Sequence, residues 1–279
     1  MDERIERAAK SQIILTVSGK GGTGKTMVGA GVTSCLAALG HETVLMDADI
    51  VLRNADIVLG LSDKAVLDFG DVTDGTAALD DAIIKHPGID GLHVLPAPAK
   101  DRVIERDALA AMLWKLKERF RFVWIDGPAG CGEWVKMLAG LADLILMVVT
   151  PDVSSNRDVV RLAGILDSPD VRPPDSVYVG KLIVNRVRPH MIRRSGAMLI
   201  DEIMDQTGLP LLGLVPEDER VIIAGNKGRA LVLYGQDGAV MAYRNIALRL
   251  LGERVPLGSM RVTGKAKSEF MHSINVVEN

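Results

Sequence analysis

The segment Gln12-Ile13-Ile14-Leu15-Thr16-Val17 runs directly into Ser18-Gly19-Lys20-Gly21-Gly22-Thr23-Gly24-Lys25-Thr26, and this stretch decides the fold. Its first part is mostly apolar and predicts a buried strand, while residues 24–39 predict a helix. The segment between them satisfies the pattern G-x-x-x-x-G-K-S/T in the strand, loop and helix context that the pattern requires. The stretch therefore predicts a phosphate-binding loop.

The loop supplies the groups that bind a nucleoside triphosphate. Its glycines let successive backbone N–H groups point at phosphate oxygens, and the start of the following helix adds partial positive charge. Lys25 would reach the β and γ phosphates of ATP, and the Thr26 hydroxyl would coordinate magnesium (Mg2+). The alternative, a glycine-rich turn without a ligand, is disfavoured by the complete motif in its context. The predicted nucleotide-binding residues of this loop are Gly19, Lys20, Gly21, Gly22, Thr23, Gly24, Lys25, Thr26 and Met27.

Outside this loop, short apolar runs alternate with longer amphipathic stretches. We predict strands at 12–17, 42–47, 91–95, 122–126, 143–149, 180–184 and 211–215, and helices at 24–39, 76–86, 103–120, 132–141, 155–166, 193–207 and 239–251. The strands are continuous in Val, Ile and Leu, which indicates burial on both faces. The sequence therefore predicts an α/β fold with a single doubly wound, mostly parallel sheet and helices on both faces.

Composition narrows the class of protein. The 279 residues are 48% hydrophobic and 25% charged, which is typical of a folded globular chain and excludes a disordered one. The net charge of -3 gives no global attraction to nucleic acid. Cys35 and Cys131 form no CxxC pair, so we expect neither a disulfide framework nor a zinc site. The charged N-terminus and the longest apolar run, at 144–149, predict neither export nor a membrane-spanning helix.

Carboxylates follow two of the predicted strands. Asp47 and Asp49 close the strand at 42–47, and Asp126 closes the strand at 122–126. Because parallel strands end at the same edge of a sheet, we expect the three to converge above the phosphate loop. For Asp126 this favours a magnesium-holding role over a helix cap. For Asp47 and Asp49 ordinary turn chemistry stays open as an alternative.

Lys20 is a second lysine that an ordinary phosphate-binding loop does not require. The segment 20–26 resembles the deviant Walker A motif of the ParA/MinD/nitrogenase-iron-protein superfamily, and the rest of the chain resembles its MinD-like branch from residue 12 to residue 256. Further stretches carry the resemblance: Asp-Ala-Asp-Ile-Val-Leu-Arg-Asn-Ala-Asp at 47–56, Val-Thr-Pro-Asp-Val-Ser-Ser-Asn-Arg-Asp at 149–158, Asn-Arg-Val-Arg-Pro at 185–189 and Val-Pro-Glu-Asp-Glu at 215–219.

The resemblance implies an ATPase that forms an ATP-dependent homodimer with two nucleotides between the subunits. Lys20 would reach across the interface to the partner's phosphates, and Asp49 would orient or activate the attacking water. Asp126 would serve the magnesium ion, with Asp47 supporting the metal shell and Thr26 as its hydroxyl ligand. Asn185 matches the position that contacts the adenine base, and Pro216 with the loop after it would border the base.

Three positions depart from the family pattern. Met27 stands where a second Thr is usual, but the magnesium ligand is Thr26, so binding should survive. Val51 replaces a Gly after Asp49, which we expect to stiffen the first switch segment. Gly127 replaces a Ser or Cys beside Asp126, which we expect to loosen the second.

The resemblance also implies partners. Residues 154–158 match the surface that binds a MinC-like division inhibitor, although a solvated helix start capped by Ser154 or Ser155 is the alternative. A topological regulator such as MinE, or an equivalent, would stimulate hydrolysis. The expected location is the cytoplasm and, in the ATP state, the inner face of the cell membrane. No nucleic acid partner is expected. The runner-up function is a ParA-type or flagellar-number ATPase that acts on nucleoid DNA or a transcription regulator. The basic run at 186–194 is the candidate patch for DNA, but a solvated charged face is favoured for this run.

The expected organisation is an N-terminal extension at 1–11, an ATPase domain at 12–256 and a C-terminal tail at 257–279. In the tail, Phe270, Met271, Ile274 and Val277 share one face of a helix, which predicts a weak amphipathic membrane anchor. A disordered terminus is the alternative. An iron-sulfur role for Cys131 is not expected, because no second cysteine lies in the required partner region.

Overall fold

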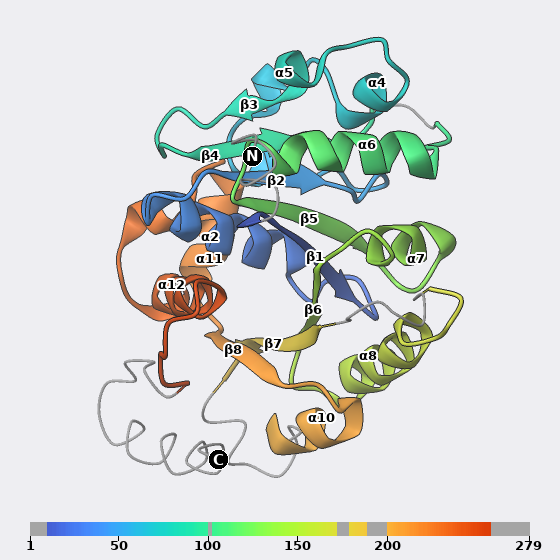
Figure 1. The fold of residues 1–279 in the computed structure, drawn as a ribbon. Helices are drawn as coiled ribbons and strands as arrows, with labels where there is room; N and C mark the ends of the chain where they lie inside the picture. The colour runs from blue at the N-terminus through green and yellow to red at the C-terminus, as the bar shows by residue number, and fades with distance from the viewer. Residues whose placement is uncertain (1–9, 100–101, 172–178, 189–199, 258–279) are drawn as a thin grey trace.

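The computed structural model describes residues 10–99, 102–171, 179–188 and 200–257, and in this part of the chain eight strands form one sheet (Figure 1). Their order is β3-β4-β2-β5-β1-β6-β7-β8, and all neighbours are parallel except β3 and β4. The strands are β1 (Gln12–Ser18), β2 (Thr43–Asp47), β3 (Ile84–Lys85), β4 (Leu92–Leu95), β5 (Phe122–Ala129), β6 (Leu144–Val149), β7 (Gly180–Val187) and β8 (Leu211–Pro216). The strand carrying the phosphate loop, β1, is therefore central.

Helices cover both faces of the sheet (Figure 1). One face carries α4 (Phe69–Thr73), α6 (Arg106–Lys117), α7 (Glu133–Ala139), α8 (Val153–Leu166) and α10 (Ile200–Thr207). The other carries α2 (Lys25–Ala38), α3 (Ala55–Val58), α11 (Glu219–Asn226) and α12 (Gly238–Leu250). The remaining short helices are α5 (Leu79–Ala82), η1 (Ser62–Lys64) and η2 (Leu231–Tyr234).

Burial along β1 explains why the strand sequences do not alternate between apolar and polar residues. Ile13, Leu15 and Val17 pack into the core under α6 to α8, while Ile14 packs into the core under α2 and α12. Successive side chains point to opposite faces of a strand, and here both faces are covered. The predicted doubly wound, mostly parallel α/β sheet with helices on both faces is confirmed.

The predicted helix at 76–86 is wrong in its second half. Helix α5 ends at Ala82, and Ile84 and Lys85 form the antiparallel edge strand β3, with Ile84 opposite Val94 of β4. A β-branched residue at a free sheet edge gains a backbone partner there, which outweighs a weak helical pattern. The helix predicted to start near residue 155 begins at Val153, because Asp152 caps it by accepting a hydrogen bond from the Ser155 N–H at 2.9 Å. Neither Ser154 nor Ser155 is the cap.

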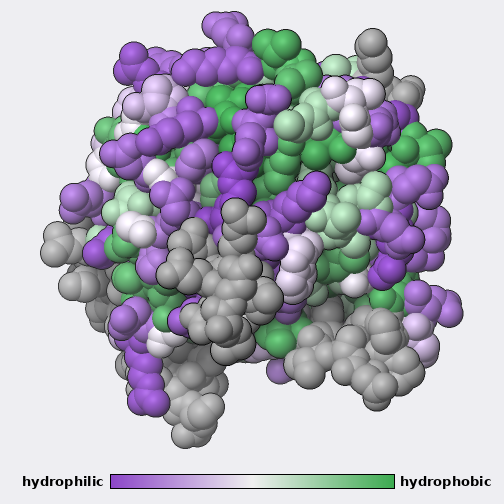
Figure 2. All heavy atoms as spheres, turned by 45° about the horizontal axis from the view of Figure 1, so that its top comes forward, coloured by the Kyte–Doolittle hydropathy of each residue, from purple (hydrophilic) through white to green (hydrophobic). Residues whose placement is uncertain are grey.

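The surface over α4, α5 and α6 carries, among the residues that the structure describes, no continuous apolar or polar patch in the view of Figure 2. The face over α4, α5 and α6, which Figure 2 turns toward the viewer, has hydrophilic and hydrophobic residues interspersed. In the described residues, no helix combines the length and the apolar character needed to cross a bilayer. The predicted membrane-anchoring face of the tail lies at 270–277, outside the described residues.

Candidate functional site

The phosphate loop lies between the end of β1 at Ser18 and the start of α2 at Lys25. Gly22 and Gly24 have φ angles of 80° and 92°, in the left-handed region that favours glycine. Helix α2 has no side-chain cap and no acidic residue in its first turn. The first N–H groups of α2 are therefore available to an anion, and the helix dipole favours one there.

Two glycines of the loop permit close packing, and two leave it open. A Cβ on Gly19 would lie 2.4 Å from the backbone of Asp158 in α8, and one on Gly24 would lie 2.4 Å from Asn185 Nδ2. In contrast, a Cβ on Gly21 or Gly22 would meet no atom within 4 Å. One side of the loop is thus fixed against the protein, and the other is open to a ligand.

Lys25 is buried at the base of the loop, with 7% of its surface exposed. Its Nζ donates a hydrogen bond to Ser18 Oγ at 3.0 Å. Burial lowers the pKa of the ammonium, while the nearby carboxylates of Asp126 and Asp49 act in the opposite direction. The buried ammonium attracts phosphate oxygens, whereas the two carboxylates call for a cation that offsets their own charge.

Asp126 and Asp47 lie opposite each other on neighbouring strands, in the register of β5 and β2. Both are nearly fully buried, and the Thr26 hydroxyl interacts with the Asp126 carboxylate in a way that acts to lower the pKa of Asp126. Burial first, and then the facing Asp47, raises the pKa of Asp126 to about 7. Asp126 Oδ1 has no hydrogen-bond partner although it is buried. A buried, unpaired carboxylate oxygen next to a hydroxyl fits a hard divalent cation or its water ligand.

Asp47 is held by backbone groups. Its Oδ1 accepts the Asp49 N–H at 3.0 Å and its Oδ2 accepts the Ala55 N–H at 2.9 Å, so it ties the end of β2 to the start of α3. Burial is the main cause that raises the pKa of Asp47, to about 6. These bonds are the turn chemistry that the sequence left open, but each oxygen keeps a lone pair for a metal-bound water.

Asp49 lies at the start of the segment that joins β2 to α3. It is buried, its Oδ1 accepts the Leu52 N–H at 3.2 Å, and its carbonyl accepts the Arg53 N–H at 2.9 Å. Arg53 has a φ of 46°, a left-handed conformation that closes the turn. Among the described residues, no three His, Cys, Asp or Glu side chains are grouped as a metal site. A magnesium ion here would therefore need phosphate, hydroxyl or water oxygens besides the Asp126 carboxylate.

Next to the loop is an open pocket of about 380 Å³. It brings together four residues from the predicted nucleotide-binding set: Gly24, Met27, Asn185 and Pro216. The loop after Pro216, which was also expected to border the base, adds Glu217 and Asp218. The sequence did not predict the rest of the lining, which comes mainly from α3 and α11: Asn54, Ile57, Val58, Arg186, Val221, Ile222, Gly225, Asn226 and Tyr243. Apolar walls with a few polar groups are typical of a site for a planar base.

Asn185 reaches this pocket because the pairing of β7 and β8 is irregular between Val184 and Val187. The irregularity places Arg186 at a φ of 56°. The Asn185 Nδ2 donates a hydrogen bond to the Thr23 carbonyl at 2.7 Å, which sets the orientation of the amide. The side chain oxygen is therefore the acceptor that Asn185 offers to a ligand.

Lys20 does not contact the rest of its own phosphate loop through its ammonium group. Its Nζ lies 2.9 Å from Asp152 Oδ1 and 2.7 Å from Ser154 Oγ, both at the start of α8. Burial raises the pKa of Asp152, but hydrogen bonds, first that of the Thr150 hydroxyl, outweigh it and the net pKa is lowered. Lys20 thus links the loop to α8.

The three residues that depart from the family pattern, Met27, Val51 and Gly127, lie in different surroundings. Met27 lines the pocket, with its Sδ and Cε next to Gly225. Val51 is 82% exposed. Gly127 lies within β5, where a Cβ would come within 2.7 Å of the Thr16 carbonyl oxygen, so close strand packing accounts for the missing side chain.

Short segments with no motif account for the pocket residues that the sequence missed. Helices α3 and α11 have four and eight residues, too few for helical periodicity to be read. A usable signal was the pair Pro216 and Asp218 after a predicted strand, which is typical of a helix start.

The chain is similar to known nucleotide-binding proteins, in agreement with the phosphate loop and the pocket beside it. A family model described as CobQ/CobB/MinD/ParA nucleotide binding domain matches residues 14–232. The chain is 38% identical to the septum site-determining protein MinD of Bacillus subtilis (strain 168) over 250 residues, which cover 88% of this chain and 91% of that protein.

Two solved structures are similar over most of the chain. One is the MinC:MinD cell division protein complex of Aquifex aeolicus, with a TM-score of 0.81 and 34% identity over 88% of this chain and 98% of that chain. The other is MinD of Pyrococcus horikoshii OT3 complexed with Mg-ADP, with a TM-score of 0.75 and 26% identity over 86% and 96% of the two chains.

Proposed function

We propose that this chain, which belongs to the CobQ/CobB/MinD/ParA nucleotide-binding family and is one of its ATPases, is a switch in division-site placement. In its ATP state it would form a homodimer, bind the cytoplasmic face of the cell membrane and recruit a division inhibitor. The observation that carries this proposal is the meeting of Lys25, Thr26 and the unpaired Asp126 oxygen beside the pocket that contains Asn185.

Hydrolysis would depend on positioning and charge neutralisation. Lys25 would bind the β and γ phosphates from below, and the N–H groups of the loop and of α2 would hold the remaining oxygens. Thr26 and Asp126 would hold magnesium, directly or through water, with Asp47 behind them. When bound, the ion would neutralise charge on the phosphates. Asp49 would orient the attacking water, and Lys20 would leave α8 to reach the partner subunit's phosphates.

A MinC-like inhibitor is the proposed partner of the start of α8. The relative from Aquifex aeolicus was solved as a MinC:MinD complex. In this chain Ser154 and Arg157 are exposed, whereas Ser155 and Asn156 are buried, and Ser155 Oγ accepts the Thr150 N–H. Only the exposed members of the predicted segment can contact a partner. A MinE-like activator, the division into a domain at 12–256 and a tail at 257–279, and the membrane anchor remain part of this proposal.

Two measurements test the proposal. Light scattering should give a dimer mass with ATP and magnesium and a monomer mass with ADP. Co-sedimentation with anionic lipid vesicles and with duplex DNA, each with ATP, separates the proposed function from a ParA-type function. ATP-dependent binding to vesicles but not to DNA is expected. Binding to DNA alone would support the ParA-type alternative.

A further inference from the structure

One carboxylate joins two helices that border the base pocket. Asp218 precedes α11 and caps it, because its Oδ1 accepts the Arg220 N–H at 3.0 Å. Its Oδ2 accepts the N–H of Ala239, in the first turn of α12, at 3.1 Å. Both helices contribute residues to the pocket, among them Ile222 from α11 and Tyr243 from α12. Asp218 therefore links the start of α11 to the start of α12.

Arg220 holds Asp218 in this orientation. The guanidinium donates from Nε to Asp218 Oδ1 at 3.0 Å and from Nη2 to Asp218 Oδ2 at 2.8 Å, a two-point contact. Its Nη1 donates to Asp237 Oδ1 at 2.6 Å, at the residue before α12. Such a planar, doubly bonded arginine fixes the direction of a carboxylate.

The backbone at Gly238 packs against the contact between Asp218 and Arg220. Gly238 has a φ of 56°, and a Cβ there would lie 2.4 Å from Arg220 Nη2 and 2.5 Å from Asp218 Oδ2. The chain entering α12 thus lies directly against the contact between Asp218 and Arg220. Only 9% of the Asp218 side chain is exposed, whereas 38% of Arg220 is exposed. Arg220 does not line the pocket and would touch no base there.

We infer that Arg220 is a positioning residue for the base of the nucleotide. It holds Asp218 so that α11 and α12 form the pocket walls before a nucleotide arrives. This inference rests on the proposed nucleotide-binding function. A preformed pocket avoids the entropic cost of ordering its walls on binding, so loss of Arg220 should weaken affinity without changing the chemistry at the phosphates.

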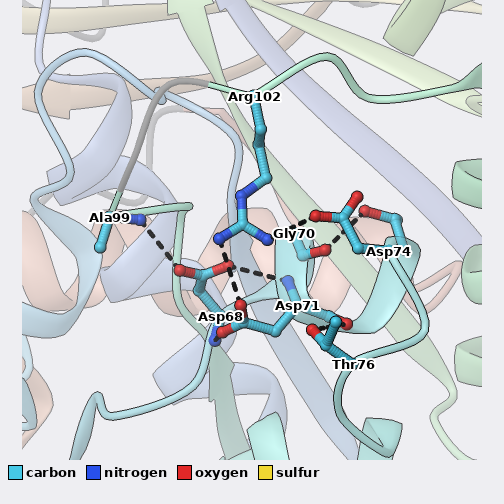
Figure 3. Close-up of polar contacts among 8 residues, drawn as sticks. Asp68, Gly70, Asp71, Asp74, Thr76, Ala99 and Arg102 are labelled. Atoms are coloured by element: carbon cyan, nitrogen blue, oxygen red, sulfur yellow. Dashed lines mark hydrogen bonds and ion pairs between the residues drawn. The ribbon is translucent and has the colours of Figure 1, made fainter.

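Arg102 offers a matched control at the other end of the molecule. It too lies between two aspartates: Nη2 donates to Asp71 at 3.1 Å and Nη1 donates to Asp74 at 2.9 Å, next to the Asp68 cap of α4 (Figure 3). Helix α4 lies against α5 and α6 beyond the end of β4, far from α11 and α12 (Figure 1). Loss of this arginine removes a similar set of ion pairs but no support of the pocket.

The experiment compares Arg220→Met, Arg220→Lys and Arg102→Met with the parent protein. The Kd for ATP with magnesium is measured by calorimetry, KM and kcat by phosphate release, and Tm by calorimetric melting. Arg220→Met should raise Kd and KM roughly tenfold while kcat stays within about twofold of the parent. Arg220→Lys should recover part of the affinity, and Arg102→Met should keep the parent's Kd and KM.

Each other outcome has a definite meaning. If the parent protein does not bind ATP, the proposed function itself fails. If the parent binds ATP and Arg220→Met binds it equally well, the positioning role is wrong. A fall in kcat together with the rise in KM would also overturn it. So would an equal loss of affinity in Arg102→Met, because the effect would then follow general destabilisation.

Discussion

The phosphate side and the base side of the site are built in different ways. On the phosphate side, one continuous loop at 18–26 supplies most of the groups, and strand register adds Asp47 and Asp126. On the base side, the pocket combines residues from α2, α3, the end of β7, α11 and α12. The first depends on local backbone geometry and buried charge, the second on how distant elements pack. We therefore expect substitutions on the two sides to differ in size and in what they change.

The largest effect is expected from Lys25→Ala. The phosphates would lose the buried cation of the loop, and Asp126 and Asp49 would be left without it, so ATP binding should become undetectable by calorimetry. The exposed Lys115 of α6 gives a control, since Lys115→Ala should bind ATP as the parent does. Measurable binding by Lys25→Ala would mean that the uncapped start of α2 suffices to hold the phosphates.

Asp126→Asn should raise the stability of the ligand-free protein and at the same time weaken magnesium binding. The raised pKa means that the folded protein binds more protons than the unfolded chain between pH about 4 and about 7, so the carboxylate makes stability fall as pH rises through this range. At pH 8 without ligand, the variant should gain free energy of unfolding on the order of 4 kcal/mol. It should also lose the magnesium dependence of ATP binding.

Denaturant melts at pH 5 and pH 8 check the Asp126→Asn prediction. The stability difference between these two pH values should be smaller in Asp126→Asn than in the parent. If the free energy of unfolding depends on pH equally in the variant and the parent, the Asp126 carboxylate does not destabilise the fold in the absence of a cation. Retained stimulation by magnesium would move the metal site elsewhere.

A moderate effect is expected from Asn185→Ala, on the base side. The variant loses the hydrogen bond to the Thr23 carbonyl and the amide oxygen that faces a ligand, so the Kd for ATP should rise roughly tenfold. Tripolyphosphate has no base, and its affinity should stay unchanged. Calorimetry measures, for each of the two ligands, the ratio of the variant's Kd to the parent's Kd. Equal losses for the two ligands would show that Asn185 acts on the loop through Thr23 rather than on the base.

The smallest effect on nucleotide affinity is expected from Lys20→Ala. Its ammonium group contacts Asp152 and Ser154, so the monomer should bind ATP within about threefold of the parent. The ATP-dependent dimer, however, should not form, because Lys20 would be missing from the partner subunit's phosphates. Light scattering with ATP is the measurement. An ATP-induced dimer of Lys20→Ala would remove the proposed role across the interface.

The sequence by itself determined the fold class, the strand that precedes the phosphate loop and the loop itself, whereas the central place of that strand came from the structure. Continuous apolar strands and a motif of adjacent residues are local signals, and their physical causes act over a few positions along the chain. The nearness of Asp47 and Asp126 was also predictable, because parallel strands run to one edge of a sheet, although β5 continues past Asp126 to Ala129. The roles assigned to these side chains remain predictions.

Only the tertiary structure decided the second half of the site. The edge strand β3 replaced the second half of a predicted helix because β4 offered it a backbone partner. Helices α3 and α11 lie too far apart in sequence for any local pattern to relate them, and Asp218 joins α11 to α12 through a single carboxylate. Lys20 is paired with α8 across 132 residues of sequence. Such contacts depend on packing between distant segments, for which a short stretch of sequence carries no signal.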